Sequence, residues 1–150
     1  MALTRILWVE NDLMPAIDSA LRDDGYDLDH AFFLSEAEEY LAGAPYDVVI
    51  IDNLMAIEPE DIEAGYTAEE TGRGNKAGLA FYRRHVSDLH EMRAGVLVYS
   101  VLGNDHAVRE EFVEAGLAGE NILYKVSEAN TSYLLRHIDR VLKASGRRGR

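Results

Sequence analysis

Short apolar runs alternate with amphipathic stretches along most of the chain. The clearest run extends from Val48 to Ile51 and directly precedes Asp52. Unbroken apolar runs of this length are typical of parallel strands that are covered on both faces. The pattern predicts five strands, over residues 6–9, 28–32, 48–51, 96–100 and 122–124.

The stretches between these runs have the spacing of amphipathic helices. The last is the clearest, because Leu134, Ile138, Val141 and Leu142 fall on one helical face. Five helices are predicted, one that begins near Pro15 and ends before Gly25, and four over residues 35–41, 76–89, 105–115 and 131–144.

Two of the predicted helices have capping signals at their starts. Pro15 fits the first turn of a helix, with Asp12 or a neighbour as the capping residue. Ser35, followed three residues later by Glu38, matches a capping box. We therefore expect side chains from these two positions to close the amino ends of the first two helices.

The alternation of strands and helices predicts an α/β domain in which helices cover both faces of a parallel sheet. Ligands of such sheets bind at the carboxyl ends of the strands, near the switch in strand order. Polar residues stand at those ends, namely Glu10, Asn11 and Asp12 after the first strand, Asp52 after the third, Ser100 at the end of the fourth and Lys125 after the fifth.

Residues 53–75 interrupt the alternation, and we call this segment the insertion. It is acidic and rich in glycine, although one or two helical turns fit residues 59–64. Loops of this length are uncommon inside a domain. One interpretation is a tolerated surface excursion. The other is a lid or docking surface beside Asp52, in which the acidic residues repel phosphate donors or compete for a cation, and Arg73 and Lys76 compensate.

Composition narrows the classes of function. The chain has 150 residues, enough for one domain, and it has no cysteine for disulfides or thiolate metal sites. No apolar run approaches the roughly 20 residues of a membrane-spanning helix. The start leads directly into a strand, so we expect no signal peptide and a cytoplasmic protein. A net charge of −12 disfavours nucleic acids and anionic membranes as partners.

The last five residues, 146–150, form a basic tail on this acidic chain. Chain ends of this kind are usually frayed. We expect a frayed tail outside a domain of residues 1–145, with contact to an acidic partner as the alternative.

Four stretches at the strand ends carry a resemblance. They are Val-Glu-Asn-Asp at residues 9–12, Asp-Val-Val-Ile-Ile-Asp at 47–52, Val-Tyr-Ser at 98–100 and Tyr-Lys at 124–125. In this order they resemble a response-regulator receiver domain of bacterial two-component signalling. The resemblance implies a flavodoxin-like, doubly wound sheet with the strand order 2-1-3-4-5. It also implies that Asp52 accepts a phosphoryl group, which Ser100 and Lys125 then bind.

The resemblance further implies a Mg²⁺ site formed by Glu10, Asn11, Asp12, Asp52 and the backbone carbonyl of Leu54. Phosphoryl transfer to a carboxylate depends mostly on positioning and on neutralising charge. Mg²⁺ commonly uses one or two carboxylates, several waters and the phosphate itself. Asn11 stands where the family usually has its main metal-binding aspartate, so we expect weaker Mg²⁺ binding than is normal for the family.

Other positions also depart from the family pattern. Ala56 and Val126 replace two prolines, and Ile122 stands where a switching aromatic residue is common. Gly78 is the best match to a glycine that normally follows the acceptor closely, and it lies 26 positions after Asp52. These departures make the chain an atypical receiver.

The leading hypothesis is a single-domain response regulator that is not an enzyme beyond slow self-dephosphorylation. A sensor histidine kinase or phosphotransfer protein would phosphorylate it, and an unknown output protein would read its state. Family analogy adds a homodimer through the fourth predicted helix, the fifth strand and the fifth helix.

Two other classes remain open at this point. A pseudo-receiver would use the same fold as a binding module without phosphorylation. A small enzyme or flavin carrier is the third class. A phosphatase of the haloacid dehalogenase type would need an aspartate where Leu54 stands, and a flavin carrier would need a phosphate-binding loop in place of the acidic residues at 10–12.

Overall fold

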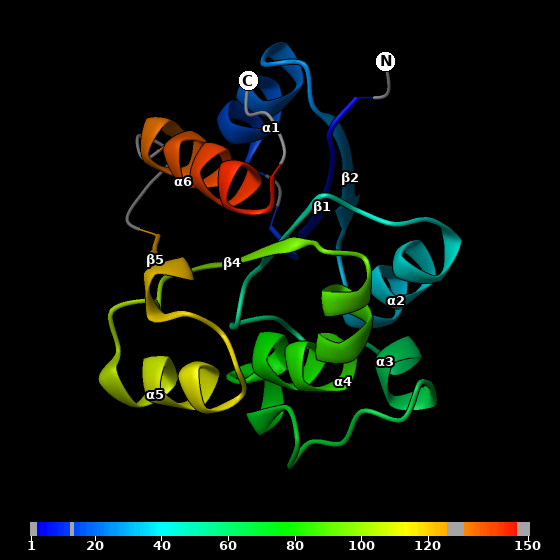
Figure 1. Cartoon of the computed structure of the whole chain (residues 1–150). Coiled ribbons are helices and arrows are strands. Elements are labelled where there is room, and N and C mark those ends of the chain that lie inside the picture. Colours follow the sequence, from blue (N-terminus) through cyan, green and yellow to red (C-terminus); the bar gives the residue numbers. More distant parts are fainter. Residues whose placement is uncertain (1–2, 13, 126–130, 147–150) are drawn as a thin grey trace.

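The computed structural model describes residues 3–12, 14–125 and 131–146 of the chain. Five parallel strands form one sheet in the order β2-β1-β3-β4-β5 (Figure 1). The strands are β1 (Arg5–Val9), β2 (Asp27–Ala31), β3 (Val48–Ile51), β4 (Gly95–Ser100) and β5 (Ile122–Tyr124). The predicted fold class and strand order are confirmed.

Six α-helices connect these strands within the described residues, one more than the sequence pattern predicts. They are α1 (Pro15–Asp23), α2 (Leu34–Gly43), α3 (Pro59–Glu63), α4 (Ala77–Glu91), α5 (His106–Glu114) and α6 (Thr131–Ala144). Two short 3-10 helices, η1 (Gly72–Gly74) and η2 (Gly119–Asn121), complete the elements. The sixth helix, α3, lies in the insertion, where one or two helical turns were expected to fit residues 59–64. Among the described helices, none combines the length and the apolar character that crossing a membrane requires.

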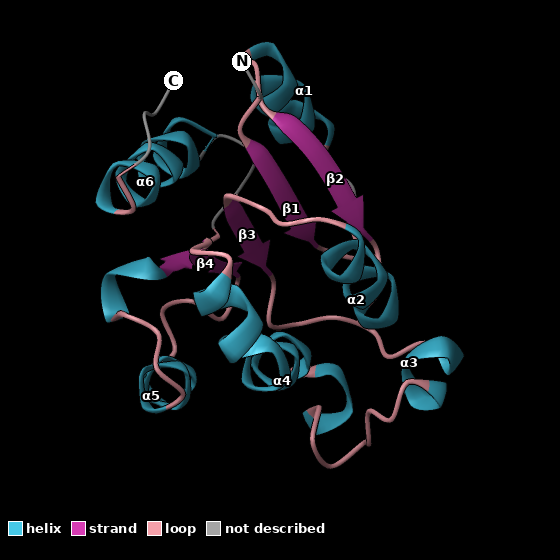
Figure 2. Ribbon diagram, turned by 45° about the vertical axis from the view of Figure 1, so that its right-hand side comes forward, coloured by secondary structure: helices cyan, strands magenta, loops and turns pink. Residues whose placement is uncertain are grey.

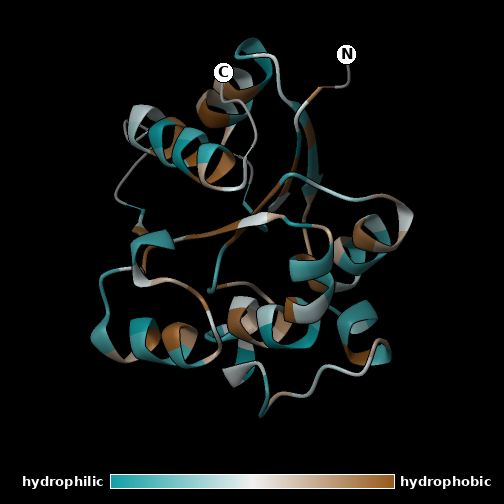
Figure 3. Cartoon of the chain, viewed as in Figure 1, coloured by the Kyte–Doolittle hydropathy of each residue, from teal (hydrophilic) through white to brown (hydrophobic). Residues whose placement is uncertain are grey.

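Each face of the sheet has its own apolar core, because successive strand residues point to opposite faces. Ile6 and Trp8 of β1 belong to the core beneath α1 and α6, whereas Leu7 and Val9 belong to the core beneath α2, α4 and α5. Figure 2 shows these two helical layers, and Figure 3 shows that the helices carry apolar and polar residues on different sides. Since both faces are covered, the ends of the strands remain as the place for a site.

The predicted cap of α1 is wrong. α1 begins at Pro15 after Met14, and the Met14 side chain makes no capping bond. The Asp12 amide donates to Glu10 Oε1 at 3.0 Å, so Asp12 belongs to the turn after β1. At α5, for which no cap was predicted, Asp105 accepts a hydrogen bond from the Val108 amide at 3.0 Å.

The predicted capping box of α2 is also wrong. α2 begins one residue earlier, at Leu34, and its N-cap residue, Phe33, makes no side-chain capping bond. Glu36 in its first turn accepts the Phe32 amide at 2.6 Å. The Ser35 amide donates to Asp61 Oδ1 at 2.8 Å, and Asp61 lies in the insertion. The other oxygen of this fully buried carboxylate accepts from the Glu58 amide at 2.9 Å, at the start of α3. One side chain of the insertion therefore closes two helices.

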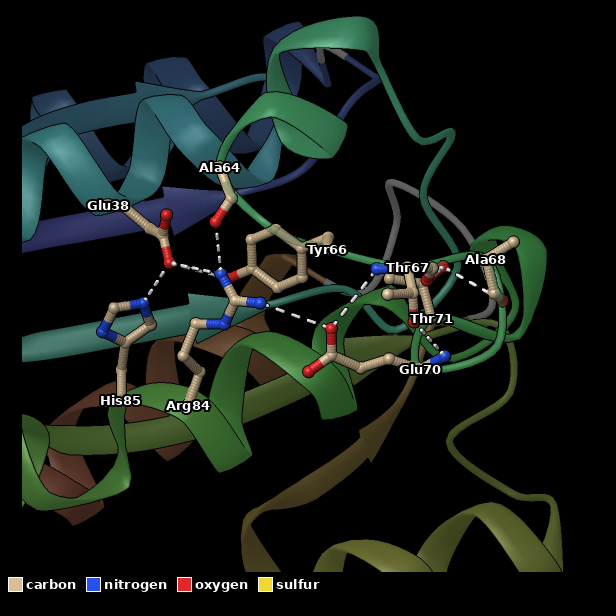
Figure 4. Close-up of polar contacts among 9 residues, drawn as sticks. All are labelled: Glu38, Ala64, Tyr66, Thr67, Ala68, Glu70, Thr71, Arg84 and His85. Carbon is tan, nitrogen blue, oxygen red and sulfur yellow. Dashed lines mark hydrogen bonds and ion pairs between the residues drawn. The ribbon is translucent and has the colours of Figure 1, made fainter.

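Arg84 of α4 fastens the middle of the insertion to the domain (Figure 4). Its guanidinium lies over the ring of Tyr66, 3.6 Å from the ring centroid, and donates to the Ala64 carbonyl at 2.9 Å. It also lies 3.3 Å from a carboxylate oxygen of Glu70. The insertion therefore has ordered contacts with the domain.

Glu38 of α2 adds a second attachment (Figure 4). The hydroxyl of Tyr66, which is 1% exposed, donates to Glu38 Oε2 at 2.9 Å. Nε2 of His85 lies 2.6 Å from the same oxygen. The residue that the sequence pattern assigns to a capping box thus binds the insertion and α4.

Candidate functional site

Glu10, Asp52 and Lys125 meet at the carboxyl edge of the sheet. Glu10 follows β1 and Asp52 follows β3, and these two strands are parallel neighbours. Lys125 follows β5, and its Nζ lies 2.7 Å from Glu10 Oε2 and 3.1 Å from Asp52 Oδ2. Both acidic residues are buried, with exposures of 1% and 4%. Three of the predicted site residues therefore form one ionic cluster.

Backbone amides orient the remaining oxygens of the two carboxylates. The Leu54 amide donates to Asp52 Oδ1 at 3.1 Å. The Asp12 amide donates in the same way to Glu10 Oε1. Each carboxylate is therefore held by the residue two positions further along the chain, and its second oxygen faces Lys125.

The cluster contains more negative than positive charge. Burial raises the pKa of Glu10 from 4.5 to about 8, Asp52 adds to the rise, and Lys125 opposes it. Burial alone would lower the pKa of Lys125, but Asp52 and Glu10 outweigh this effect and raise it. Two buried carboxylates that share one ammonium group favour the uptake of a proton or of a cation.

Ser100 lies at the same edge, at the end of β4. It is fully buried, and its hydroxyl accepts a hydrogen bond from the Leu102 amide at 3.3 Å. Its carbonyl accepts from the Lys125 amide at 2.8 Å, which ties the two chain segments together. Among the described residues no hydrogen bond joins the Ser100 hydroxyl to Asp52.

A pocket of about 300 Å³ lies beside residues 53–56, which follow the predicted phosphoryl acceptor Asp52 and which we call the acceptor loop. The described residues that line it are Asn11, Asp12, Leu54, Met55, Ala56, Arg73, Gly74 and Asn75. Asn11, Asp12 and Leu54 of the predicted metal site thus belong to one pocket, together with residues of the insertion. Within the described part of the chain, the only acidic residue in the lining is Asp12, so no acidic residue of the insertion lines this pocket.

The predicted metal ligands supply a suitable but incomplete donor set. Glu10 and Asp52 offer the hard carboxylate oxygens that Mg²⁺ prefers, and their excess negative charge favours a cation. Among the described residues, however, no group of three Asp, Glu or His side chains is arranged to hold a metal ion. Water and phosphate oxygens would have to complete the coordination, as is usual for Mg²⁺.

Asn53 is a positioning residue that the sequence does not reveal. Its Oδ1 accepts from the Leu79 amide at 2.9 Å, and its Nδ2 donates to the Asn75 carbonyl at 3.1 Å. It therefore joins the acceptor loop both to the start of α4 and to the end of the insertion. The pattern contains no signal for this role, because both partners lie more than 20 residues away.

Gly78, at the start of α4, packs directly on residues 51–53, around Asp52. A Cβ atom there would lie 2.8 Å from Ile51 Cγ2 and 2.9 Å from Asn53 Cα, closer than real contacts allow. The residue that the resemblance assigns to the glycine after the acceptor thus lies against it in space.

Three positions that depart from the family pattern, Ile122, Ala56 and Val126, differ in where the structure places them. Ile122 is buried, 4% exposed, while its neighbour Tyr124 is 40% exposed. Ala56 lines the pocket beside the acceptor loop. Val126 and the tail beyond residue 146 lie outside the described residues.

No protein-family model matches the sequence, and a search of curated proteins finds no match. Solved structures do match. A CheY-like response regulator receiver domain from Methanospirillum hungatei has a TM-score of 0.70 at 15% identity, over 97% of this chain and 98% of that one. A receiver domain of the Francisella response regulator 1452 has a TM-score of 0.67 at 19% identity, over 95% and 98% of the two chains.

A third match is the beryllofluoride-activated NtrC4 receiver domain dimer. Its TM-score is 0.69 at 17% identity, over 95% of this chain and 99% of that one. At these identities the likeness concerns the fold. The chain therefore has the fold of response-regulator receiver domains over nearly its whole length.

Proposed function

We propose that this chain is a single-domain response regulator whose Asp52 accepts a phosphoryl group from a sensor histidine kinase or a phosphotransfer protein. The observation that carries the proposal is the contact of one lysine, Lys125, with both Asp52 and Glu10 at the carboxyl edge of a receiver-type sheet. The phosphorylated form would act through protein contacts in the cytoplasm, without enzymatic activity beyond slow self-dephosphorylation.

The residues of the cluster would divide the work of transfer. The Asp52 carboxylate attacks the phosphorus atom of phosphohistidine, the phosphorus–nitrogen bond breaks, and the imidazole leaves. Lys125 can then pair either with Glu10 or with the new phosphoryl oxygens, which carry more negative charge than the original carboxylate. The Ser100 hydroxyl can donate to one of these oxygens. Such an exchange of partners by Lys125 and Ser100 would distinguish the two states.

A bound Mg²⁺ would supply positive charge that offsets the negative charge of the carboxylates and of the incoming phosphoryl group. Glu10, Asp52, the carbonyl of Leu54 and the side chains of Asn11 and Asp12 would hold it, with water. Because Asn11 brings no charge, we propose that this site needs more Mg²⁺ than is usual for receiver domains.

Incubation with Mg²⁺ and acetyl phosphate, followed by intact mass measurement, tests the proposal. We expect one phosphate adduct on the wild type, none on Asp52→Asn, and an unchanged adduct on the matched control Asp23→Asn, which alters an exposed aspartate of α1. The absence of an adduct on the wild type at saturating Mg²⁺ would contradict the proposal. An adduct that persists in Asp52→Asn would show that another residue is the acceptor.

The second candidate is a pseudo-receiver that binds a partner without phosphorylation. It is favoured by the existing ion pairs of Lys125, which already satisfy this residue without a phosphate, and by the uncharged Asn11. The intact-mass experiment separates the two candidates, because a pseudo-receiver gives no adduct.

Homodimerisation through α5, β5 and α6 is the expected consequence of activation. The NtrC4 receiver, which has the same fold, forms a dimer in its beryllofluoride-activated state. Light scattering after size-exclusion chromatography, with and without beryllofluoride, measures whether this chain does the same. A monomer under both conditions would exclude this output.

A further inference from the structure

The end of the insertion is hydrogen-bonded to the acceptor loop. The Met55 amide donates to the Gly74 carbonyl at 3.0 Å, and Asn53 Nδ2 donates to the Asn75 carbonyl at 3.1 Å. These two bonds fix residues 74 and 75 beside the residues that immediately follow Asp52. The preceding residue, Arg73, is therefore held close to the acceptor loop by backbone geometry.

Arg73 lines the pocket that also contains Asn11 and Asp12. Its side chain is exposed, and among the described residues it makes no ion pair or hydrogen bond. The two neighbouring cations differ in this respect, because Lys76 pairs with Glu111 at 3.1 Å and Arg84 pairs with Glu70 at 3.3 Å. Of the cations that the sequence places at the end of the insertion, Arg73 alone keeps a charge that no described carboxylate neutralises.

The backbone at Arg73 is costly for an arginine. Its φ of 58° is left-handed, and it lies between Gly72 and Gly74, which are also left-handed. This conformation is unfavourable for a residue with a Cβ and costs nothing for glycine. Arg93 has the same φ, so the conformation alone does not identify a site. At Arg73 it coincides with an unpaired side chain that lines a pocket, and this combination points to a ligand.

The charges of the acceptor site favour a further cation that binds the phosphoryl donor. Asp52, Glu10 and Asp12 are three carboxyl groups, and Lys125 is the ammonium that already pairs with two of them. A phosphoryl donor brings two further negative charges into this field. Arginine suits phosphate because its planar group can donate two parallel hydrogen bonds to phosphate oxygens.

We propose that Arg73 is a phosphate-binding residue of the acceptor site, which contacts the phosphoryl oxygens of the donor as the group passes to Asp52. This inference rests on the proposed function. During transfer the bond from phosphorus to the leaving oxygen of an acyl phosphate, or to the leaving nitrogen of phosphohistidine, breaks while the bond to the Asp52 oxygen forms. Arg73 exchanges no proton or electron in this step.

The test compares Arg73→Ala with the matched control Arg83→Ala, which removes an exposed arginine of α4. The rate of adduct formation at Asp52 is measured over a range of acetyl phosphate and phosphoramidate concentrations at fixed Mg²⁺. We expect Arg73→Ala to lower the rate at low donor concentration by about fivefold to tenfold for both donors at low salt, and less at high salt. Arg83→Ala is expected to leave both rates unchanged.

A binding measurement without transfer accompanies the rates. Titration with inorganic phosphate, followed by amide chemical shifts around residues 53–55, should give a weaker affinity for Arg73→Ala by a similar factor. Arg73→Gly should show the same loss of phosphate binding but a melting temperature a few degrees higher, because glycine relieves the left-handed strain. If Arg73 had only a structural role, a variant with a higher melting temperature would not bind phosphate more weakly.

The outcomes distinguish this inference from the proposed function. Wild-type rates and phosphate affinity in Arg73→Ala would overturn the inference and leave the function of Asp52 intact. A loss with only one of the two donors would also overturn it, since that result indicates contact with the leaving group. If the wild type forms no adduct, the proposed function fails, and the phosphate titration alone then decides for or against Arg73.

Discussion

Replacement of Asp61 by alanine is expected to weaken two helices at once. Asp61 is fully buried, and its two oxygens accept the amides of Ser35 at 2.8 Å and of Glu58 at 2.9 Å. The first bond closes the amino end of α2, and the second closes that of α3. Alanine leaves both amides without these acceptors in a place that water reaches poorly.

The size of the effect follows from the two bonds. A lost helix cap typically costs about 1 kcal/mol, and a buried amide left without a partner costs about 1–3 kcal/mol. For Asp61→Ala we expect the free energy of unfolding to fall by roughly 2–4 kcal/mol. Asp61→Asn keeps one acceptor oxygen but turns an NH₂ donor toward the other amide, so its loss should approach that of alanine. Both variants should still fold, because single domains have about 5–15 kcal/mol of stability.

Urea denaturation, followed by the fluorescence of the buried Trp8, measures these differences. The matched control is Glu63→Ala, which removes an exposed carboxylate from the same helix, α3, and should change stability little. Hydrogen exchange adds a local reading, since the Ser35 amide should lose protection in Asp61→Ala. A change below about 0.5 kcal/mol in Asp61→Ala would refute the reasoning. It would mean that the insertion does not stabilise the domain through this residue.

Three further predictions concern the site and the attachment of the insertion. Gly78→Ala should destabilise the domain by about 1–3 kcal/mol in thermal or urea unfolding, although alanine favours helices, because the new Cβ meets the Asn53 backbone. Without metal, the free energy of unfolding of the wild type should fall as the pH rises from 4.5 to about 8, because folding raises the pKa of Glu10. In Glu10→Gln, the free energy of unfolding measured with urea should depend less on pH over this range. Arg84→Ala should cost about 1–2 kcal/mol and make the insertion more sensitive to limited proteolysis, because the contact with Tyr66 is lost.

The strands and their order could be predicted because they depend on local pattern. The run from Val48 to Ile51 is fully buried in the middle of the sheet, and an unbroken apolar run is typical of such a position. The same logic locates Asp52, since the residue after a central parallel strand must lie at the carboxyl edge. Asp105 caps α5 through a local bond, because donor and acceptor lie three residues apart, although no cap was predicted there.

The caps of α1 and α2 could not be predicted from nearby residues. Ser35 and Glu38 have the spacing of a capping box, yet the buried carboxylate of Asp61 takes the amide of Ser35 from 26 residues away. The Glu38 carboxylate contacts Tyr66 and His85 instead of the amino end of α2. Interactions with distant segments decide the start of α2, and a local pattern contains no information about them. At α1, the N-cap residue Met14 makes no side-chain capping bond.

The insertion can lengthen the chain after Asp52 without moving the start of α4 away from it. The Gly78 amide lies 3.4 Å from the Asn53 carbonyl, and the Leu79 amide donates to the Asn53 side chain, so α4 is fixed to the acceptor segment itself. The bond between Met55 and Gly74 closes the insertion at its base. A loop whose ends are held together adds little entropic cost as it grows. The separation of 26 positions between Asp52 and Gly78 is therefore a distance along the chain and not in space. This arrangement explains how the carboxyl edge of the sheet keeps the geometry of a receiver fold despite the long insertion. The last residues of the insertion are themselves held beside the acceptor loop.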